Sequence, residues 1–205
     1  MDAFESALLE HWQTDAAHDI AHIHRVWSNA QAIAQKDALE VEQDVLRAAT
    51  VFHDLVNLPK DAPNRAVASR LSAQAADPIL ADLGMSAVNR AKVAHAITAH
   101  SYSAGIPPET DEARILRDAD RLDALGAIGI ARMMAVSGAL GRAIYDPNDP
   151  FAAGRALDDT RWSIDHFETK LFRLADDMLT KTGRRIATDR TRYMRAYLKQ
   201  LTSEM

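Results

Sequence analysis

The stretch Ala48-Ala-Thr-Val-Phe-His-Asp-Leu-Val56 is an apolar run that two polar residues interrupt. From just before this stretch onward, apolar side chains recur at Val45, Ala49, Phe52 and Leu55. Steps of three and four residues place side chains on one face of an α-helix, so a helix is expected here. The polar pair is His53-Asp54, and an unpaired carboxylate inside a protein is strongly unfavourable. A metal ion or an arginine would satisfy this pair, which makes the helix the first candidate for a functional site.

Helical spacing also appears in the rest of the chain. Three further apolar stripes are Ile20, Ile23, Val26, Ala30 and Ile33; Val93 and Ile97; and, in one long segment, Ile115, Leu116, Leu122, Leu125, Ile128 and Met133. Runs of alternating β-branched residues, which would indicate strands, are nearly missing. The sequence therefore predicts an all-α fold.

Proline, glycine and threonine mark the expected helix ends. Pro59 and Pro63 should close the helix of His53, Asp77-Pro78 and Gly84 should bound a short helix, and Thr110 should start another. Two more helices are expected near residues 161–181 and 187–204.

Composition limits the kinds of protein this chain can be. It has 205 residues, of which 47% are hydrophobic, enough for one domain with one core. It has no cysteine, which excludes disulfides and thiolate zinc sites. Because no signal segment or membrane-spanning apolar run is found, we expect a cytoplasmic protein with no membrane partner. The net charge of -5 predicts no nucleic-acid partner, although it does not exclude a local basic patch.

Histidine and aspartate are concentrated in three helical segments, at residues 18–26, 51–55 and 116–124. Imidazole and carboxylate together suit divalent magnesium, manganese, iron or zinc. Side chains from separate helices of a bundle can converge on one ion in its core. The third segment leaves a choice among Asp118, Asp120 and Asp123, of which one could be a ligand, one a partner of a ligand and one a solvated charge.

Two histidines lie on the helix expected around Val93 and Ile97. His100 shares their apolar face, whereas His95 lies about 140° away around the helix. The two are therefore not expected to bind one metal together, which argues against a dinuclear centre. We assign His100 to substrate contact or proton transfer, and His95 to no role.

The order of these segments resembles the HD superfamily of metal-dependent phosphohydrolases. The matching segments are His22-x-x-Arg25-Val26, His53-Asp54-Leu-Val-x-x-Pro59-Lys60, Ala96-Ile97-x-x-His100-Ser101, Asp118-Ala-Asp120-Arg121-Leu-Asp123-Ala124-x-Gly126-Ala-Ile-Gly129-Ile-Ala-Arg132 and His166-Phe167-x-x-Lys170-Leu171. They are similar to a bacterial and fungal HD subgroup whose members are about as long as this chain. Some of those members hydrolyse nucleoside triphosphates to the monophosphate and pyrophosphate.

The resemblance implies a role for each matching residue. The metal ligands would be His22, His53, Asp54 and Asp120. Asp120 is preferred to its neighbours because it directly precedes a basic residue. The catalytic residues would be Asp54, Asp120, His100 and Arg121, and the substrate-binding residues Arg25, Lys60, Arg65 and Asp123.

The resemblance also implies a fold and a function. The fold would be a single compact HD-domain bundle over residues 1–205, with a core at about 18–135, a metal site in it, and C-terminal helices at about 161–204 packed on it. The cofactor would be one divalent ion among manganese, magnesium, iron, nickel and zinc, with manganese or magnesium favoured for activity. The substrate would be a small phosphorylated molecule, expected to be a nucleotide. Alternatives at the same site are a nucleoside monophosphate phosphatase, a phosphodiesterase and a non-catalytic nucleotide or metal sensor. The sequence does not indicate the oligomeric state.

Overall fold

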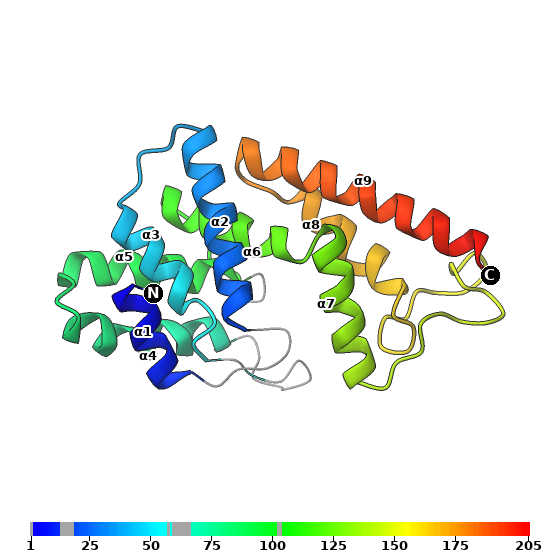
Figure 1. The fold of residues 1–205 in the computed structure, drawn as a ribbon, viewed down its shortest axis with the longest axis horizontal. Coiled ribbons are helices and arrows are strands. Elements are labelled where there is room, and N and C mark those ends of the chain that lie inside the picture. Colours follow the sequence, from blue (N-terminus) through cyan, green and yellow to red (C-terminus); the bar gives the residue numbers. More distant parts are fainter. Residues whose placement is uncertain (1, 13–18, 57, 59–66, 102–103) are drawn as a thin grey trace. The chain divides into compact units, whose positions relative to one another are not determined.

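The computed structural model describes residues 2–12, 19–56, 58, 67–101 and 104–205, which form helices joined by turns and loops (Figure 1). No β-strand occurs in these ranges, where one isolated parallel bridge joins Ala143 and Trp162. The prediction of an all-α fold is confirmed. The chain divides into two compact units, residues 1–120 and 121–205. That these units form a single domain stays a prediction.

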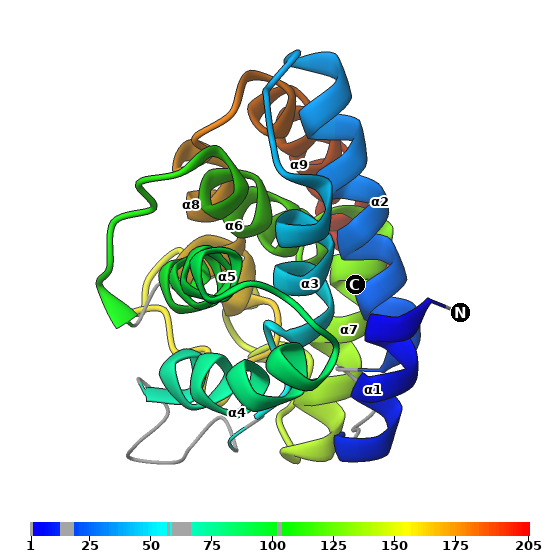
Figure 2. The same cartoon turned by 90° about the vertical axis from the view of Figure 1, so that its left-hand side faces the viewer.

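The first unit is built around one central helix. Its elements are α1 (Ala3–His11), α2 (Ile20–Lys36), α3 (Gln43–Phe52), α4 (Ala68–Asp82), α5 (Ala87–His100) and the larger part of α6 (Asp111–Asp123). The central helix is α3, because α1, α2, α4 and α5 all contact it (Figure 2). From Val45 to Phe52, every side chain of α3 except that of Arg47 is buried. The helix that leads into His53 therefore passes through the core of this unit.

Short polar side chains cap several of these helices, including the two that carry His22 and Asp120. Asp19 caps α2, where its carboxylate accepts a hydrogen bond of 2.8 Å from the backbone N–H of His22. Thr110 starts α6 as predicted, because its hydroxyl accepts from the N–H of Ala113. Both caps act on helices that carry a predicted metal ligand, so they help to set the position of that ligand along the chain.

The helix expected to begin at Asp77-Pro78 is longer than predicted. Instead, α4 starts at Ala68 and continues through Pro78, which removes one N–H from the helical ladder. Ala76 and Leu80, on either side of the proline, are almost fully buried, and this packing keeps the helix continuous. The predicted end is confirmed, because Gly84 follows the helix with a φ of 82°.

The second unit contains the end of α6 and the elements α7 (Gly126–Ala139), a π-helical turn η3 (Phe167–Leu171), α8 (Phe172–Asp176) and α9 (Lys181–Ser203). Both α7 and α8 contact α9. The helix expected from 187 starts earlier, because the hydroxyl of Thr180 accepts a hydrogen bond from Gly183 and caps α9. The helix expected over 161–181 is shorter, because residues 161–164 form turns and the helical part runs from 165 through η3 and α8 to Asp176.

A break at Gly126 divides the long apolar segment expected after Ile115 into α6 and α7. Gly126 has a φ of 77°, and a β-carbon there would lie 3.1 Å from the side chain of Arg190 on α9. Its lack of a side chain therefore permits both the turn and the close approach of α9. No single helix in the described ranges is long and apolar enough to span a membrane, and only α6 and α7 taken together meet that length and composition.

Candidate metal centre

Four of the predicted site residues converge in the first unit from three directions. His22 lies in the first turn of α2, His53 and Asp54 directly follow α3, and Asp120 lies near the end of α6. Both histidines are fully buried, whereas the side chains of Asp54 and Asp120 are 25% and 29% exposed. The cluster is therefore closed on the imidazole side and open to solvent on the carboxylate side.

The polar atoms of these side chains lie close enough to share one ion. His22 Nε2 lies 3.3 Å from His53 Nε2, 3.6 Å from Asp120 Oδ1 and 3.9 Å from Asp54 Oδ2. His53 Nε2 lies 3.5 Å from Asp54 Oδ2 and 3.8 Å from Asp120 Oδ1. An ion with ligands at about 2.1 Å would separate neighbouring ligands by roughly 3.0 Å at a right angle and 3.4 Å at the tetrahedral angle. His22, His53 and Asp120 fit a divalent ion after a movement of a few tenths of an ångström, and Asp54 adjoins this set beside His53.

A backbone hydrogen bond determines which nitrogen of His53 faces this cluster. Its Nδ1 lies 2.8 Å from the carbonyl oxygen of Thr50, one turn earlier. A carbonyl can only accept, so Nδ1 carries the proton and Nε2 presents a lone pair in the neutral ring. Metal-binding histidines commonly donate their second nitrogen in this way. The final turn of α3 thus prepares His53 as a ligand.

The charges of the cluster also suit a divalent cation. Burial alone would raise the pKa of Asp120, but the imidazoles of His53, His22 and His100 outweigh it and hold that pKa below its ordinary value. Asp120 is therefore ionised at neutral pH. Two carboxylates and two imidazoles that bind a metal in their neutral form would give a donor set of charge about -2, which one divalent cation would neutralise.

His100 lies beside the four candidate ligands. Its Nδ1 donates to the carbonyl of Ile97 at 2.5 Å, its ring packs edge-on against that of His53, and its Nε2 lies 3.9 Å from Asp54 Oδ1. Burial and the neighbouring His53 lower the pKa of His100, against the opposing effect of the Asp120 and Asp54 carboxylates. One oxygen of Asp54 thus faces the two ligand histidines and the other faces His100.

Three residues that the sequence interpretation overlooked hold the ligand segments in place. The buried amide of Asn29 donates a hydrogen bond of 3.1 Å to the carbonyl of Ala119, the residue before Asp120. Trp12 Nε1 donates a hydrogen bond of 3.2 Å to the carbonyl of Asp54. The hydroxyl of Ser72 on α4 both accepts from the N–H of Val56 and donates to its carbonyl. Only Asn29 left a signal in the sequence, as a polar residue beside the apolar stripe of its helix.

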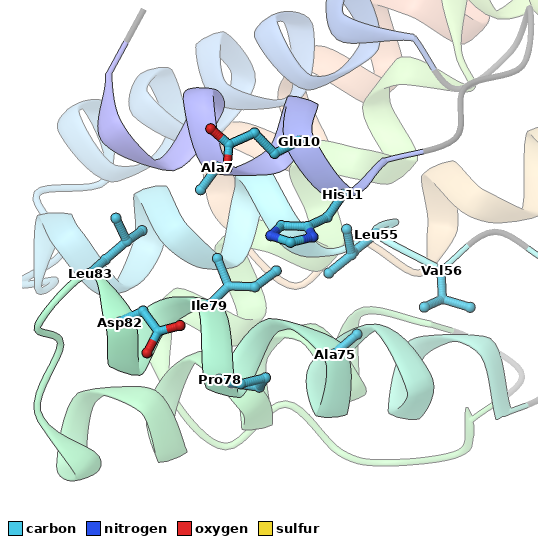
Figure 3. A pocket seen from close by; sticks show the side chains of 10 residues that line it. All are labelled: Ala7, Glu10, His11, Leu55, Val56, Ala75, Pro78, Ile79, Asp82 and Leu83. Atoms are coloured by element: carbon cyan, nitrogen blue, oxygen red, sulfur yellow. The ribbon is translucent and has the colours of Figure 1, made fainter.

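A pocket of about 570 Å³ lies next to the turn that carries His53 and Asp54 (Figure 3). It is lined by the C-terminal part of α1, the C-terminal half of α4, and Leu55 and Val56. Among the described residues, none of the four candidate ligands lines it. The pocket therefore borders the backbone of the ligand turn and takes no part in the ligand cluster itself.

The predicted substrate-binding cations have different positions in the chain. Arg25 lies on α2 one turn after His22 and is half-buried. Lys60 and Arg65 lie outside the described residues.

Among the other histidines, His24 is exposed and contacts Glu5, and His95 accepts a hydrogen bond from the N–H of Glu109. Neither belongs to the ligand cluster.

The remaining predicted residues of α6 have other contacts. Asp118 is fully buried and is not among the residues grouped around the candidate ion. Arg121 is 5% exposed and donates to both the carboxylate and the carbonyl of Asp177. Asp123 is 1% exposed and accepts from Arg132 at 2.8 Å. These contacts serve the packing of the second unit, and the roles of Arg121 and Asp123 toward substrate stay predictions.

Known proteins match this chain over nearly its whole length. The sequence profile of the HD domain matches residues 19–125, a range that includes all four candidate ligands. YpgQ of Bacillus subtilis (strain 168) is 31% identical over 194 residues, 93% of this chain and 85% of YpgQ. The crystal structure of B. subtilis YpgQ in complex with ADP has a TM-score of 0.75 and 30% identity over 98% of this chain and 97% of that one. That of an HD-superfamily hydrolase from Bacillus thuringiensis has a TM-score of 0.72 and 30% identity over 98% and 94% of the two chains. The cluster takes its ligands in the chain order His22, His53-Asp54 and Asp120. Together with these matches, it places the chain in the HD domain family.

Proposed function

We propose that this protein is a metal-dependent phosphohydrolase that converts nucleoside triphosphates to monophosphates and pyrophosphate. The observation that carries the proposal is the cluster of His22, His53, Asp54 and Asp120, in which each histidine Nε2 lies 3.3 to 3.9 Å from the other histidine and from one oxygen of each aspartate. The cofactor would be one divalent ion, with manganese or magnesium favoured for activity. When bound, such an ion makes a water molecule more nucleophilic and polarises a phosphate oxygen.

The protein's own residues would hold the ion and handle the proton. His22 and His53 are fully buried, and Nδ1 of His53 donates to Thr50, so both would serve only as ligands. Asp54 has a second carboxylate oxygen directed toward His100, 3.9 Å from its Nε2. Because Nδ1 of His100 donates to Ile97, Nε2 can accept a proton or orient water. Asp54 and His100 would thus position the attacking water and accept its proton.

Cationic residues near the ligands would hold the phosphates. Arg25 lies one turn from His22, and Lys60 and Arg65 follow the His53-Asp54 segment in the sequence. Guanidinium and ammonium groups form charge-assisted contacts with phosphate oxygens, which are among the strongest polar contacts. Three cations exceed what a single monophosphate ester would need. They would hold the β and γ phosphates while water attacks the α phosphorus, and the α–β bridging oxygen would leave with pyrophosphate.

A relative supports the choice of a nucleotide. YpgQ of B. subtilis crystallised in complex with ADP, and its structure matches this chain over 98% of its length. A protein of this fold therefore binds a nucleoside diphosphate. Transferred to this chain, that observation supports a nucleotide substrate over another phosphate ester, and leaves the broken bond to be measured.

The first experiment tests the enzyme itself. Metal-free protein would be assayed with a panel of nucleoside mono-, di- and triphosphates, with and without manganese, for released phosphate and pyrophosphate. We expect turnover of triphosphates that requires the metal and is lost in Asp54→Ala. His24→Ala is the matched control, because His24 is an exposed histidine on α2 outside the cluster. A protein that binds manganese and nucleotide but turns none over would instead be a sensor.

The second experiment identifies the bond. In oxygen-18 water, attack at the α phosphorus labels the nucleoside monophosphate. Label found only in free orthophosphate, with nucleoside diphosphate as co-product, would contradict the proposal. Lys60→Ala should raise KM more than it lowers kcat. If Lys60 contacts the phosphates equally strongly in the bound substrate and in the transition state, its loss weakens binding without slowing the chemical step. Release of orthophosphate from monophosphates alone would make the protein a phosphatase.

A further inference from the structure

The positive charge of this acidic protein is concentrated in its last helix. The helix α9 holds seven lysines and arginines and one aspartate, so it contributes +6 to a chain whose net charge is -5. The rest of the chain therefore carries -11. The net charge of -5, which predicts no nucleic-acid partner, is a sum over two parts of opposite sign. Within a Debye length of about 8–10 Å, a local cluster determines the attraction.

Six of these cations form a stripe on one side of α9, here called the basic stripe: Lys181, Arg184, Arg185, Arg192, Arg195 and Lys199. All six are exposed. At 100° per residue they fall within an arc of about 100°, and from Lys181 to Lys199 they extend about 27 Å along the helix axis. Asp189 is the only acidic residue of α9, and it pairs with Arg192, whose side chain remains 74% exposed. The stripe thus consists of two groups of three cations, at 181–185 and 192–199, about 10.5 Å apart along the helix axis.

The other side of α9 is anchored in the second unit. Ala187 and Met194 are fully buried, and Tyr197 stacks on Phe167 with ring centres 6.2 Å apart. Arg190 reaches from this side to the carbonyl of Leu122. Because the helix is held by these contacts, the backbone positions that carry the basic stripe keep their spacing.

We propose that the basic stripe binds the phosphate backbone of a nucleic-acid duplex. The choice rests on charge complementarity, because six exposed cations on one side of a helix attract the closely spaced phosphates of a duplex. Anionic membranes usually require apolar side chains beside the cations, and the arc contains none. Single strands are usually held by stacked aromatic rings, and the exposed aromatic residue of α9, Tyr193, lies outside the arc. The proposal is independent of the metal centre.

The proposal sets a measurable affinity and salt dependence. Binding that uses only phosphates has a Kd of about 10⁻⁴ to 10⁻⁶ M at physiological salt. Four to six phosphate contacts would weaken binding by roughly 10²- to 10³-fold between 50 and 200 mM salt. No preference for base sequence is expected, because phosphate contacts carry no sequence information.

The test uses a fluorescently labelled 20-base-pair DNA duplex and the full chain, with anisotropy measured at several salt concentrations. The variant Arg185→Glu/Arg192→Glu/Lys199→Glu reverses half of the basic stripe and should abolish binding. The matched control, Lys36→Glu/Arg70→Glu/Arg114→Glu, reverses three exposed cations of the first unit and should keep the Kd within about threefold. The milder Arg185→Gln/Arg192→Gln/Lys199→Gln should weaken binding at least tenfold if the stripe is the contact.

Several outcomes would overturn the proposal. One is the absence of binding at 50 mM salt, and another is an equal loss of binding in the stripe and control variants. Tighter binding to vesicles containing anionic lipid would assign the stripe to membranes. A change of oligomeric state in the stripe variant, seen by sedimentation without any effect on the duplex, would assign it to a second copy of the chain. Thermal unfolding checks that each variant is folded.

Discussion

The side-chain amide of Asn29 on α2 is bonded to the carbonyl of Ala119 on α6, at 3.1 Å. This hydrogen bond joins α2, whose first turn carries His22, to the residue directly before Asp120. We expect Asn29→Ala to lower the free energy of unfolding by about 1–1.5 kcal/mol, because it removes a buried hydrogen bond between two helices. The affinity for manganese should fall as well, since α6 is no longer held in register.

Urea unfolding and calorimetric titration with manganese measure these two effects. Gln35→Ala is the control, because Gln35 is exposed on the same helix. It should change neither quantity by more than about 0.5 kcal/mol. An Asn29→Ala protein that binds manganese as tightly as the native chain would show that this bond stabilises the fold alone.

Two aspartates of α6 should respond in opposite ways to loss of charge. Asp120→Asn should lose most of the bound metal and of the activity, while the protein stays helical and folded. Asp118→Asn should retain one metal ion per chain but be less stable, because Asp118 is fully buried and outside the ligand cluster. Metal analysis and circular dichroism distinguish the two. Metal retained in Asp120→Asn and lost in Asp118→Asn would mean that the ligand is Asp118.

Trp12 should report ion binding by its fluorescence. Its indole nitrogen is bonded to the carbonyl of Asp54, so it lies beside the proposed centre. Paramagnetic manganese should therefore quench the fluorescence of the native protein. Most of this change should disappear in Trp12→Phe and remain in Trp27→Phe and Trp162→Phe. Equal quenching in all three variants would indicate that manganese binds elsewhere.

Metal-free protein should lose stability as the pH falls below about 6.5. Because the pKa of folded His100 is lowered from its ordinary value of 6.5, the unfolded chain binds a proton more readily. The free energy of unfolding should fall with decreasing pH there, by at most about 1.4 kcal/mol per pH unit for this one proton. The lowered pKa of Asp120 acts in a different window, since its contribution is lost only below its ordinary value of 3.8.

Urea unfolding in the presence of a chelator at pH 7.5 and 5.5 measures this effect. In His100→Asn the free energy of unfolding should depend less on pH, because asparagine does not titrate. The control His95→Asn lies on the same helix, outside the ligand cluster, and should leave the slope unchanged. A slope that stays the same in His100→Asn would mean that other groups take up the proton.

Much of this arrangement could be predicted from local patterns. The helical spacing of apolar residues is a property of neighbouring positions, and it located α2, α3, α5 and α6. The cap of α6 was recognisable at Thr110 for the same reason. The order of His22, His53-Asp54 and Asp120 came from resemblance to a family, and geometry now places these residues in one cluster.

The features that were missed depend on contacts between distant segments. The residues near Pro78 in the sequence do not show that the burial of Ala76 and Leu80 keeps α4 helical on both sides of the proline. The bond from Trp12 to Asp54 joins positions 42 residues apart, and a tryptophan near a helix end has many other uses. Arg121 directly follows a candidate ligand, yet its bond to Asp177 exists only because the chain folds back 56 residues later.

The location of the candidate ligands at helix ends has a kinetic consequence. His22 lies in the first turn of α2, while His53 and Asp54 directly follow the last residue of α3. Terminal turns fray first, since their backbone bonds open without unfolding the rest of the helix. A bound ion would hold the start of α2 and the end of α3 in their helical conformation. Loss of the ion would therefore increase local opening at both places. Amide hydrogen exchange should then accelerate at residues 20–23 and 53–56 in metal-free protein, while the buried middle of α3 keeps its protection.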